Sequence, residues 1–118
     1  MRLGQFFQTA DNEGREKHVP VIDCPASVAA GEYFDLYVTV GKEVPHPNKP
    51  EHHIKWIQLF GRFDSGQVIH LATFDFAPVL TEPRVKATLA FDRPVTIFAL
   101  AYCNIHGLWE NYAEVKVL

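Results

Sequence analysis

The sequence predicts an all-β fold, an immunoglobulin-like antiparallel β-sandwich of about seven short strands. Apolar and polar residues alternate with a period of two over several short runs, which is typical of strands that bury one face. Turn-forming residues separate these runs at 30–32, 64–66, 81–83 and 92–94. Aromatic residues make up 13% of the chain and include nine Phe, which also favours a β-rich core.

Each expected element follows from this pattern. The only helical candidate is a short turn at 3–8, and a strand is expected to start near Val19 and Pro20. Residues 95–102 are nearly all apolar, which predicts a central strand covered on both faces. Period-two alternation predicts further strands at 34–40, 68–76, 84–91 and 115–117.

Composition limits the possible functions. The 118 residues suit a single domain over 1–118, and no internal repeat or linker divides them. Eleven Lys and Arg against 14 Asp and Glu give a net charge of −3, so we expect no nucleic-acid partner. No stretch approaches the roughly 20 apolar residues of a membrane helix, and the first residues do not resemble a signal peptide. Two distant cysteines make no disulfide framework. We therefore expect a cytoplasmic protein without a membrane partner.

The histidines are the most informative residues. Cys103 and His106 follow the predicted central strand, three residues apart, and Gly107 lets the chain turn away. A thiolate and an imidazole at this spacing can bind one metal ion from a single turn. Alone, the pair is equally well explained by a buried, inert cysteine.

A second segment carries His46 and His52 with two prolines between them, at 47 and 50. Each proline ring fixes φ, so the loop is stiff and loses less entropy when it binds a metal. His52 and His53 are neighbours and face opposite ways in an extended chain, so only one of the two is expected in the ligand set. His18 would supply a fourth imidazole, whereas His70 is expected in the core or on a strand surface.

The donor set discriminates between metals. Four imidazoles and one thiolate exceed what a tetrahedral zinc site takes. A blue-copper site would use an axial methionine, but Met1 is the only methionine in the chain. Iron accepts five nitrogen and sulfur ligands and keeps a sixth position open for a small molecule.

Four motifs resemble superoxide reductase in its one-iron form, also called neelaredoxin and related to the iron domain of desulfoferrodoxin. The resemblance covers almost the whole chain, and the desulfoferrodoxins' additional rubredoxin-like domain has no counterpart in this sequence. The motifs are EKHVPVI at 16–22, VGKEVPHPN at 40–48, EHHIKWI at 51–57 and YCNIHGLWE at 102–110. The chain departs from many relatives at 77–80, where a longer loop rich in Gly and Asn is replaced by a short connection.

The resemblance implies a β-sandwich with one exposed mononuclear non-haem iron. Cys103 would be the axial thiolate, with Asn104 and the backbone that follows as hydrogen-bond donors to its sulfur. Glu16 would be a sixth ligand in the ferric state, and Lys17 would steer substrate beside the open position. Cys24 matches no functional position and is expected to be buried or partly buried. The equatorial ligands would be His18, His46, His52 and His106.

The activity that the resemblance implies is one-electron reduction of superoxide to hydrogen peroxide, an oxidoreductase reaction of antioxidant defence. Rubredoxin or a similar small electron carrier would be the donor, and relatives form homodimers or homotetramers. Three other readings stay open on the residues alone. They are an electron-transfer iron protein, a β-sandwich with a purely structural metal, and superoxide dismutation.

Overall fold

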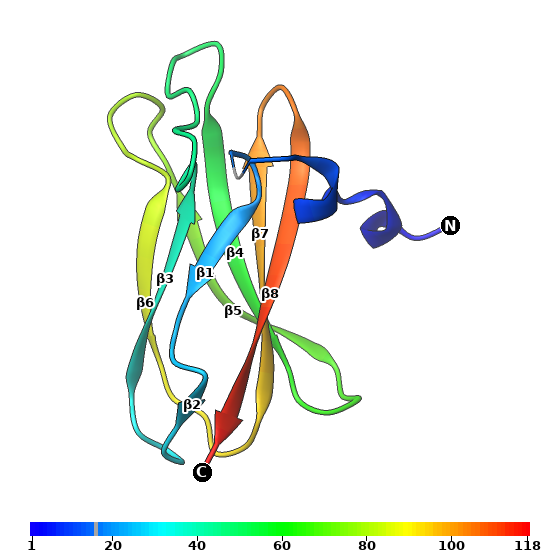
Figure 1. The fold of residues 1–118 in the computed structure, drawn as a ribbon, viewed down its shortest axis with the longest axis vertical. Helices are drawn as coiled ribbons and strands as arrows, with labels where there is room; N and C mark the ends of the chain where they lie inside the picture. The colour runs from blue at the N-terminus through cyan, green and yellow to red at the C-terminus, as the bar shows by residue number, and fades with distance from the viewer. Residues whose placement is uncertain (16) are drawn as a thin grey trace.

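Two β-sheets pack face to face in the computed structural model, which describes residues 1–15 and 17–118 (Figure 1). The smaller sheet has the strand order β1-β3-β6, and both of its pairings are antiparallel. Its strands are β1 (Pro20–Asp23), β3 (Phe34–Val40) and β6 (Arg84–Leu89). The predicted all-β sandwich is therefore confirmed.

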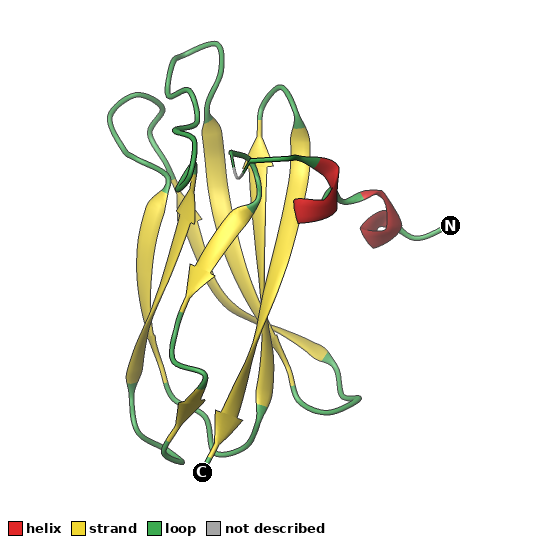
Figure 2. Cartoon of the chain, in the orientation of Figure 1, coloured by secondary structure: helices red, strands yellow, loops and turns green. Residues whose placement is uncertain are grey.

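The larger sheet has the order β2-β8-β7-β4-β5. Its pairings are antiparallel apart from β2 with β8, which run parallel over two residues of β2. Its strands are β2 (Ser27–Val28), β4 (Ile54–Arg62), β5 (Val68–Asp75), β7 (Val95–Cys103) and β8 (Gly107–Val117). Two short 3₁₀ helices, η1 (Leu3–Phe6) and η2 (Ala10–Asn12), precede the first strand (Figure 2).

Alternate residues of facing strands fill the space between the sheets. Leu36 of β3, Ile57 of β4 and Ile97 of β7 are fully buried there. The burial of β7 alternates without interruption from Val95 to Cys103, so the Cys103 side chain lies on the core side at the end of the strand. The hydrophobic core thus fixes the position of this thiol.

Strand β4 is absent from the sequence-based prediction because its burial pattern changes phase. Ile54 and Ile57 are both buried although they are three residues apart. The pairing of β4 with β7 shifts register between Ile54 and Trp56, as in a β-bulge, and this shift breaks the period of two.

The prediction that residues 95–102 form a central strand is confirmed, since β7 lies between β8 and β4. The prediction that both faces are covered is wrong for the single chain. The outward residues of β7 are only half-buried, and Phe98 and Leu100 line a shallow, mainly apolar hollow of about 370 Å³ with Phe7, Phe60, Val68 and Glu110.

In the described part of the chain, no helix is long and apolar enough to cross a membrane. Cys24 is half-buried against the core, as expected, and burial raises the pKa of its thiol. His70 is exposed on β5, where its Nε2 lies 2.7 Å from Thr73 Oγ1.

Candidate metal centre

Three connections meet at one end of the sandwich (Figure 1). They are the segment that enters β1, the loop between β3 and β4, and the turn between β7 and β8. These connections carry His18, then His46 and His52, then Cys103 and His106. Residues separated by up to 88 positions are brought together because their strands end on the same side of the two sheets.

One donor atom from each of His18, His46, His52 and Cys103 lies within 4.8 Å of the others. His106 joins this group, since its Nδ1 is 3.1 Å from His18 Nε2 and 3.7 Å from Cys103 Sγ. The four imidazole rings form a closed circuit with neighbouring centroids 4.7–5.0 Å apart. We call these five residues the His4Cys cluster.

His18 is held from two sides. Its Nδ1 lies 3.1 Å from Glu13 Oε2, and its ring stacks on Trp109 at a centroid distance of 4.8 Å. These contacts leave Nε2 directed at the cluster. Burial lowers the pKa of His18 despite the hydrogen bond to Glu13, which acts in the opposite direction.

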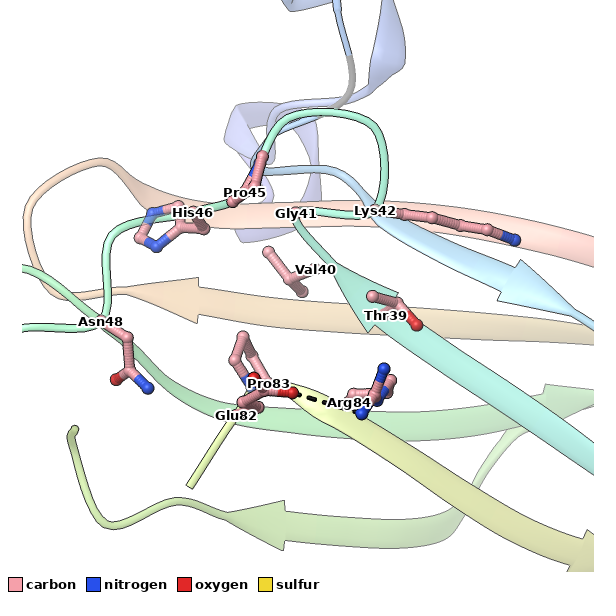
Figure 3. A pocket seen from close by; sticks show the side chains of 10 residues that line it. All are labelled: Thr39, Val40, Gly41, Lys42, Pro45, His46, Asn48, Glu82, Pro83 and Arg84. Atoms are coloured by element: carbon pink, nitrogen blue, oxygen red, sulfur yellow. Dashed lines mark ion pairs between the residues drawn. The ribbon is translucent and has the colours of Figure 1, made fainter. Parts of the chain in front are cut away.

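His46 is buried, and its Nδ1 lies 2.7 Å from the carbonyl oxygen of Pro47. Gly41 lies close to the backbone of His46 with a φ of +86°, and a Cβ at this position would lie 2.5 Å from the His46 backbone nitrogen (Figure 3). Burial is the main cause that lowers the pKa of His46 to about 4, so the ring is neutral at pH 7 and free to coordinate. Beside His46 a cavity of about 420 Å³ with a mixed polar and apolar lining runs between the β3 end and residues 82–84 (Figure 3).

Asn104 ties the part of the β3–β4 loop that carries His52 to the turn that follows Cys103. The Asn104 Oδ1 accepts the His53 N–H at 2.8 Å, and its Nδ2 donates to the Glu51 carbonyl at 3.0 Å. His53 itself points elsewhere, with its Nδ1 3.1 Å from the Lys49 carbonyl. The expectation that Asn104 donates to the sulfur is therefore wrong, because its side chain closes the His52–His53 loop.

The sulfur of Cys103 is buried and accepts the backbone N–H of His106 at 3.3 Å. The expected backbone donor to the sulfur is therefore present. His106 is exposed, and its carbonyl oxygen accepts hydrogen bonds from Gln8 Nε2 and Trp109 Nε1, both at 3.2 Å. The cluster thus has a buried sulfur end and an exposed imidazole end.

The cluster's hydrogen bonding fits a metal ion. Among the described residues, His46 Nε2 and His52 Nε2 are buried nitrogens without a hydrogen-bond partner. A buried polar atom left unpaired costs about 1–3 kcal/mol, so two of them facing each other need a shared partner. A cation satisfies both nitrogens together with the thiolate, and the mix of imidazole and sulfur suits a transition metal.

Two further residues, Glu16 and Lys17, are predicted to act at the site. Glu16 lies outside the described residues. Lys17 is half-buried, and its positive charge is among the causes that lower the pKa of His18, His46 and His52, behind burial in each case. The charge of Lys17 is thus felt at the cluster.

Sequence reasoning missed the residues that hold the cluster in place. Glu13, Gln8 and Trp109 support His18 and His106, and Gly41 makes room for His46. Only Gly41 and Trp109 lie inside the motifs quoted above. Burial raises the pKa of Glu13, but hydrogen bonds from the backbone N–H groups of Val19, Lys17 and His18 and from the His18 side chain more than offset this, so the pKa is lowered overall.

Comparisons with known proteins identify the family of this chain. The superoxide reductase of Thermococcus kodakarensis is 44% identical, with 97% of this chain and 99% of that protein covered. The neelaredoxin of Megalodesulfovibrio gigas is 38% identical over 99% of both chains. The solved superoxide reductase (neelaredoxin) of Ignicoccus hospitalis superposes with a TM-score of 0.90 over 100% of both chains at 34% identity. Residues 10–112 match the desulfoferrodoxin family, and the chain therefore belongs to that family.

Proposed function

We propose that this chain is a superoxide reductase, which reduces superoxide to hydrogen peroxide by one electron at a mononuclear non-haem iron, one per chain. The observation that supports this most is the His4Cys cluster, in which a buried thiol lies beside four imidazoles at the surface end of a rigid sandwich. The alignments with superoxide reductases of this family cover almost the whole of this chain.

The proposed ligands are His18, His46, His52, His106 and Cys103. His18, His46 and His52 would coordinate through Nε2, since Nδ1 of the first two is already bonded and Nε2 of the last two is unpaired. His106 would use Nδ1, the nitrogen nearest to the sulfur. When bound there, ferrous iron supplies the single electron, and superoxide takes up two protons to give hydrogen peroxide.

Other residues of this chain would attract the superoxide anion and tune the metal site. Lys17 would attract superoxide by its positive charge, against a net charge of −3 for the whole chain. A thiolate at Cys103, stabilised by the His106 N–H, would donate electron density from the buried side. Glu16 would bind the ferric state at rest, as the resemblance implies. Superoxide is small, so an exposed cluster is sufficient and the cavity beside His46 is not needed.

The reaction requires an external electron for each turnover. Rubredoxin or a similar small carrier is the proposed donor, and the exposed His106 edge is where such a protein could approach the cluster. Both cysteines are free thiols, which fits a reducing, cytoplasmic location.

We further propose that the chain forms a homo-oligomer, a dimer or a tetramer. The apolar hollow on the outer face of the larger sheet supports this, because β7 is apolar on that face as well as on its core face. A second copy placed there would cover the face that the sequence predicts to be covered.

The decisive experiment mixes iron-loaded, fully reduced protein with superoxide by stopped flow and counts products. One peroxide per superoxide without oxygen is expected for reduction. Half a peroxide with half an oxygen would indicate dismutation instead. Absence of a fast reaction would indicate that the metal serves electron transfer or only stabilises the fold. A metal that only stabilises the fold is recognised because the protein unfolds when a chelator removes it.

A further inference from the structure

Among the described acidic groups near the His4Cys cluster, the carboxylate of Glu13 accepts the most hydrogen bonds. It follows η2, and its side chain is only 12% exposed. Oε1 accepts the backbone N–H groups of Lys17, His18 and Val19, each at 2.9 Å. Oε2 lies 3.1 Å from His18 Nδ1. A single side chain thus contacts both the backbone and the ring of one proposed ligand.

We propose that Glu13 is the positioning residue that fixes the tautomer and orientation of His18, and thereby sets the metal affinity of the cluster. A carboxylate only accepts hydrogen bonds, so His18 Nδ1 must carry the proton. The lone pair then lies on Nε2, which faces His106 and the centre of the cluster. This inference rests on the metal site of the proposed function but not on the reaction with superoxide.

The surroundings of His18 restrict the orientation of its ring and of the segment that carries it. Trp109 stacks on one face of the ring at an interplanar angle of 16°, so the ring cannot tilt freely. The three backbone bonds to Oε1 hold the segment that carries Lys17 and His18 against the end of η2. Carboxylates that bond a ligating histidine typically change metal affinity by about 10–100-fold when they are replaced.

Glu13→Gln separates the two tasks of this carboxylate. The amide oxygen still accepts the three backbone N–H groups, whereas the amide NH₂ now faces His18 Nδ1 as a donor. His18 must then accept at Nδ1 and move its proton to Nε2, where it blocks metal binding. The expected result is a rise of about 10–100-fold in the dissociation constant for ferrous ion. Glu32→Gln removes the same charge from an exposed turn and is the matched control.

A second measurement needs no metal. In metal-free wild-type protein, ¹⁵N NMR of the histidine rings should show His18 protonated at Nδ1, and Glu13→Gln should shift the proton to Nε2. His18 protonated at Nε2 in the wild type would overturn the proposal. An affinity for ferrous ion that stays within twofold of the wild type in folded Glu13→Gln would also overturn it.

The two proposals fail in different ways. If the wild type binds iron but does not react with superoxide, the proposed function falls and the affinity and tautomer results still decide the role of Glu13. If Glu13→Gln does not fold, the tautomer of the wild-type protein decides it alone.

Discussion

At the scale of single residues, three of the proposed ligands are held in place by neighbours outside the cluster. Pro47 holds His46 through a carbonyl, Asn104 closes the loop that carries His52, and Glu13 holds His18. Such supports are expected because a ligand that moves by a fraction of an ångström weakens both metal binding and catalysis.

Cys103→Ser should remove the sulfur-to-iron charge-transfer absorption of the oxidised, iron-loaded protein, since a hydroxyl does not give this band. The spectrum of ferric protein measures it. Cys24→Ser is the control, because Cys24 lies outside the cluster, and it should leave the band in place. A band that survives in Cys103→Ser would contradict the assignment of the thiolate ligand.

Lys17→Ala should slow the reaction with superoxide and flatten its dependence on ionic strength, while iron stays bound. The physical reason is the loss of one positive charge close to the cluster. Lys116→Ala makes the same change on β8 at the opposite end of the sandwich and should leave the rate unaltered. Stopped-flow rates over a salt series give the comparison; equal rates for the wild type and Lys17→Ala at low salt would exclude steering by Lys17.

Gly41→Ala should weaken iron binding, because the new methyl group would lie 2.5 Å from the backbone nitrogen of His46. Gly31→Ala is a matched control: its φ of +76° is similar, and nothing lies within 4 Å of its added Cβ. Both variants should lose about 1–2 kcal/mol of unfolding free energy from the left-handed backbone. Only Gly41→Ala should also lose ferrous affinity in a titration, and an unchanged affinity would show that the loop adapts.

At the scale of elements, the ligand loop is tied to the connection between β5 and β6. Asn48 Oδ1 accepts the Val79 N–H at 2.8 Å, and Asn48 Nδ2 donates to the Thr81 carbonyl at 3.2 Å. Val79 has a φ of +74°, which is unfavourable for a β-branched residue. The short connection at 77–80 is thus held in a strained form by a residue of the ligand loop.

Val79→Asn should raise the unfolding free energy by about 1 kcal/mol, because Asn tolerates the left-handed region. Val79 is 51% exposed, so little apolar burial is lost. Ile69→Asn, at a β-branched position that is 38% exposed in strand β5, should not stabilise the protein. Denaturant unfolding of the metal-free proteins measures both; no gain at Val79 would mean that the surroundings offset the strain.

The elements also show what the sequence could and could not predict. Period-two patterns located the strands that keep a regular register, such as β3 and β7. They missed β4, where a bulge shifts the register. The resemblance supplied the five proposed ligands. It did not indicate the role of Glu13, because the hydrogen bonds of Glu13 depend on how Lys17 and His18 lie against the end of η2. A lone acidic residue in a loop carries no pattern that would indicate such a contact.

At the scale of the whole molecule, the two sheets differ in their outer surfaces. The larger sheet exposes an apolar hollow around Phe60, Phe98 and Leu100. The outer face of the smaller sheet instead carries polar pairs such as Asp35 with Thr88, whose side chains bond at 2.8 Å. This asymmetry places the proposed contact between copies on the larger sheet.

Phe98→Glu should dissociate the oligomer into monomers, because a charge would be buried without a partner between two apolar faces. Tyr37→Glu makes a comparable change on the outer face of the smaller sheet and should leave the oligomer intact. Sedimentation velocity gives the mass of each form. A wild type that sediments as a monomer, or a Phe98→Glu protein of unchanged mass, would contradict this interface.

The depth of the Cys103 sulfur has a consequence for the durability of the protein. Hydrogen peroxide, the proposed product, oxidises accessible thiolates to sulfenic acid and beyond. Cys103 is fully buried on the core side of β7, whereas His106 is exposed. Peroxide formed at the exposed side would meet the imidazole rings before it reached the sulfur. If the proposed reaction takes place there, the packing that anchors the thiol would also limit its oxidation by the product.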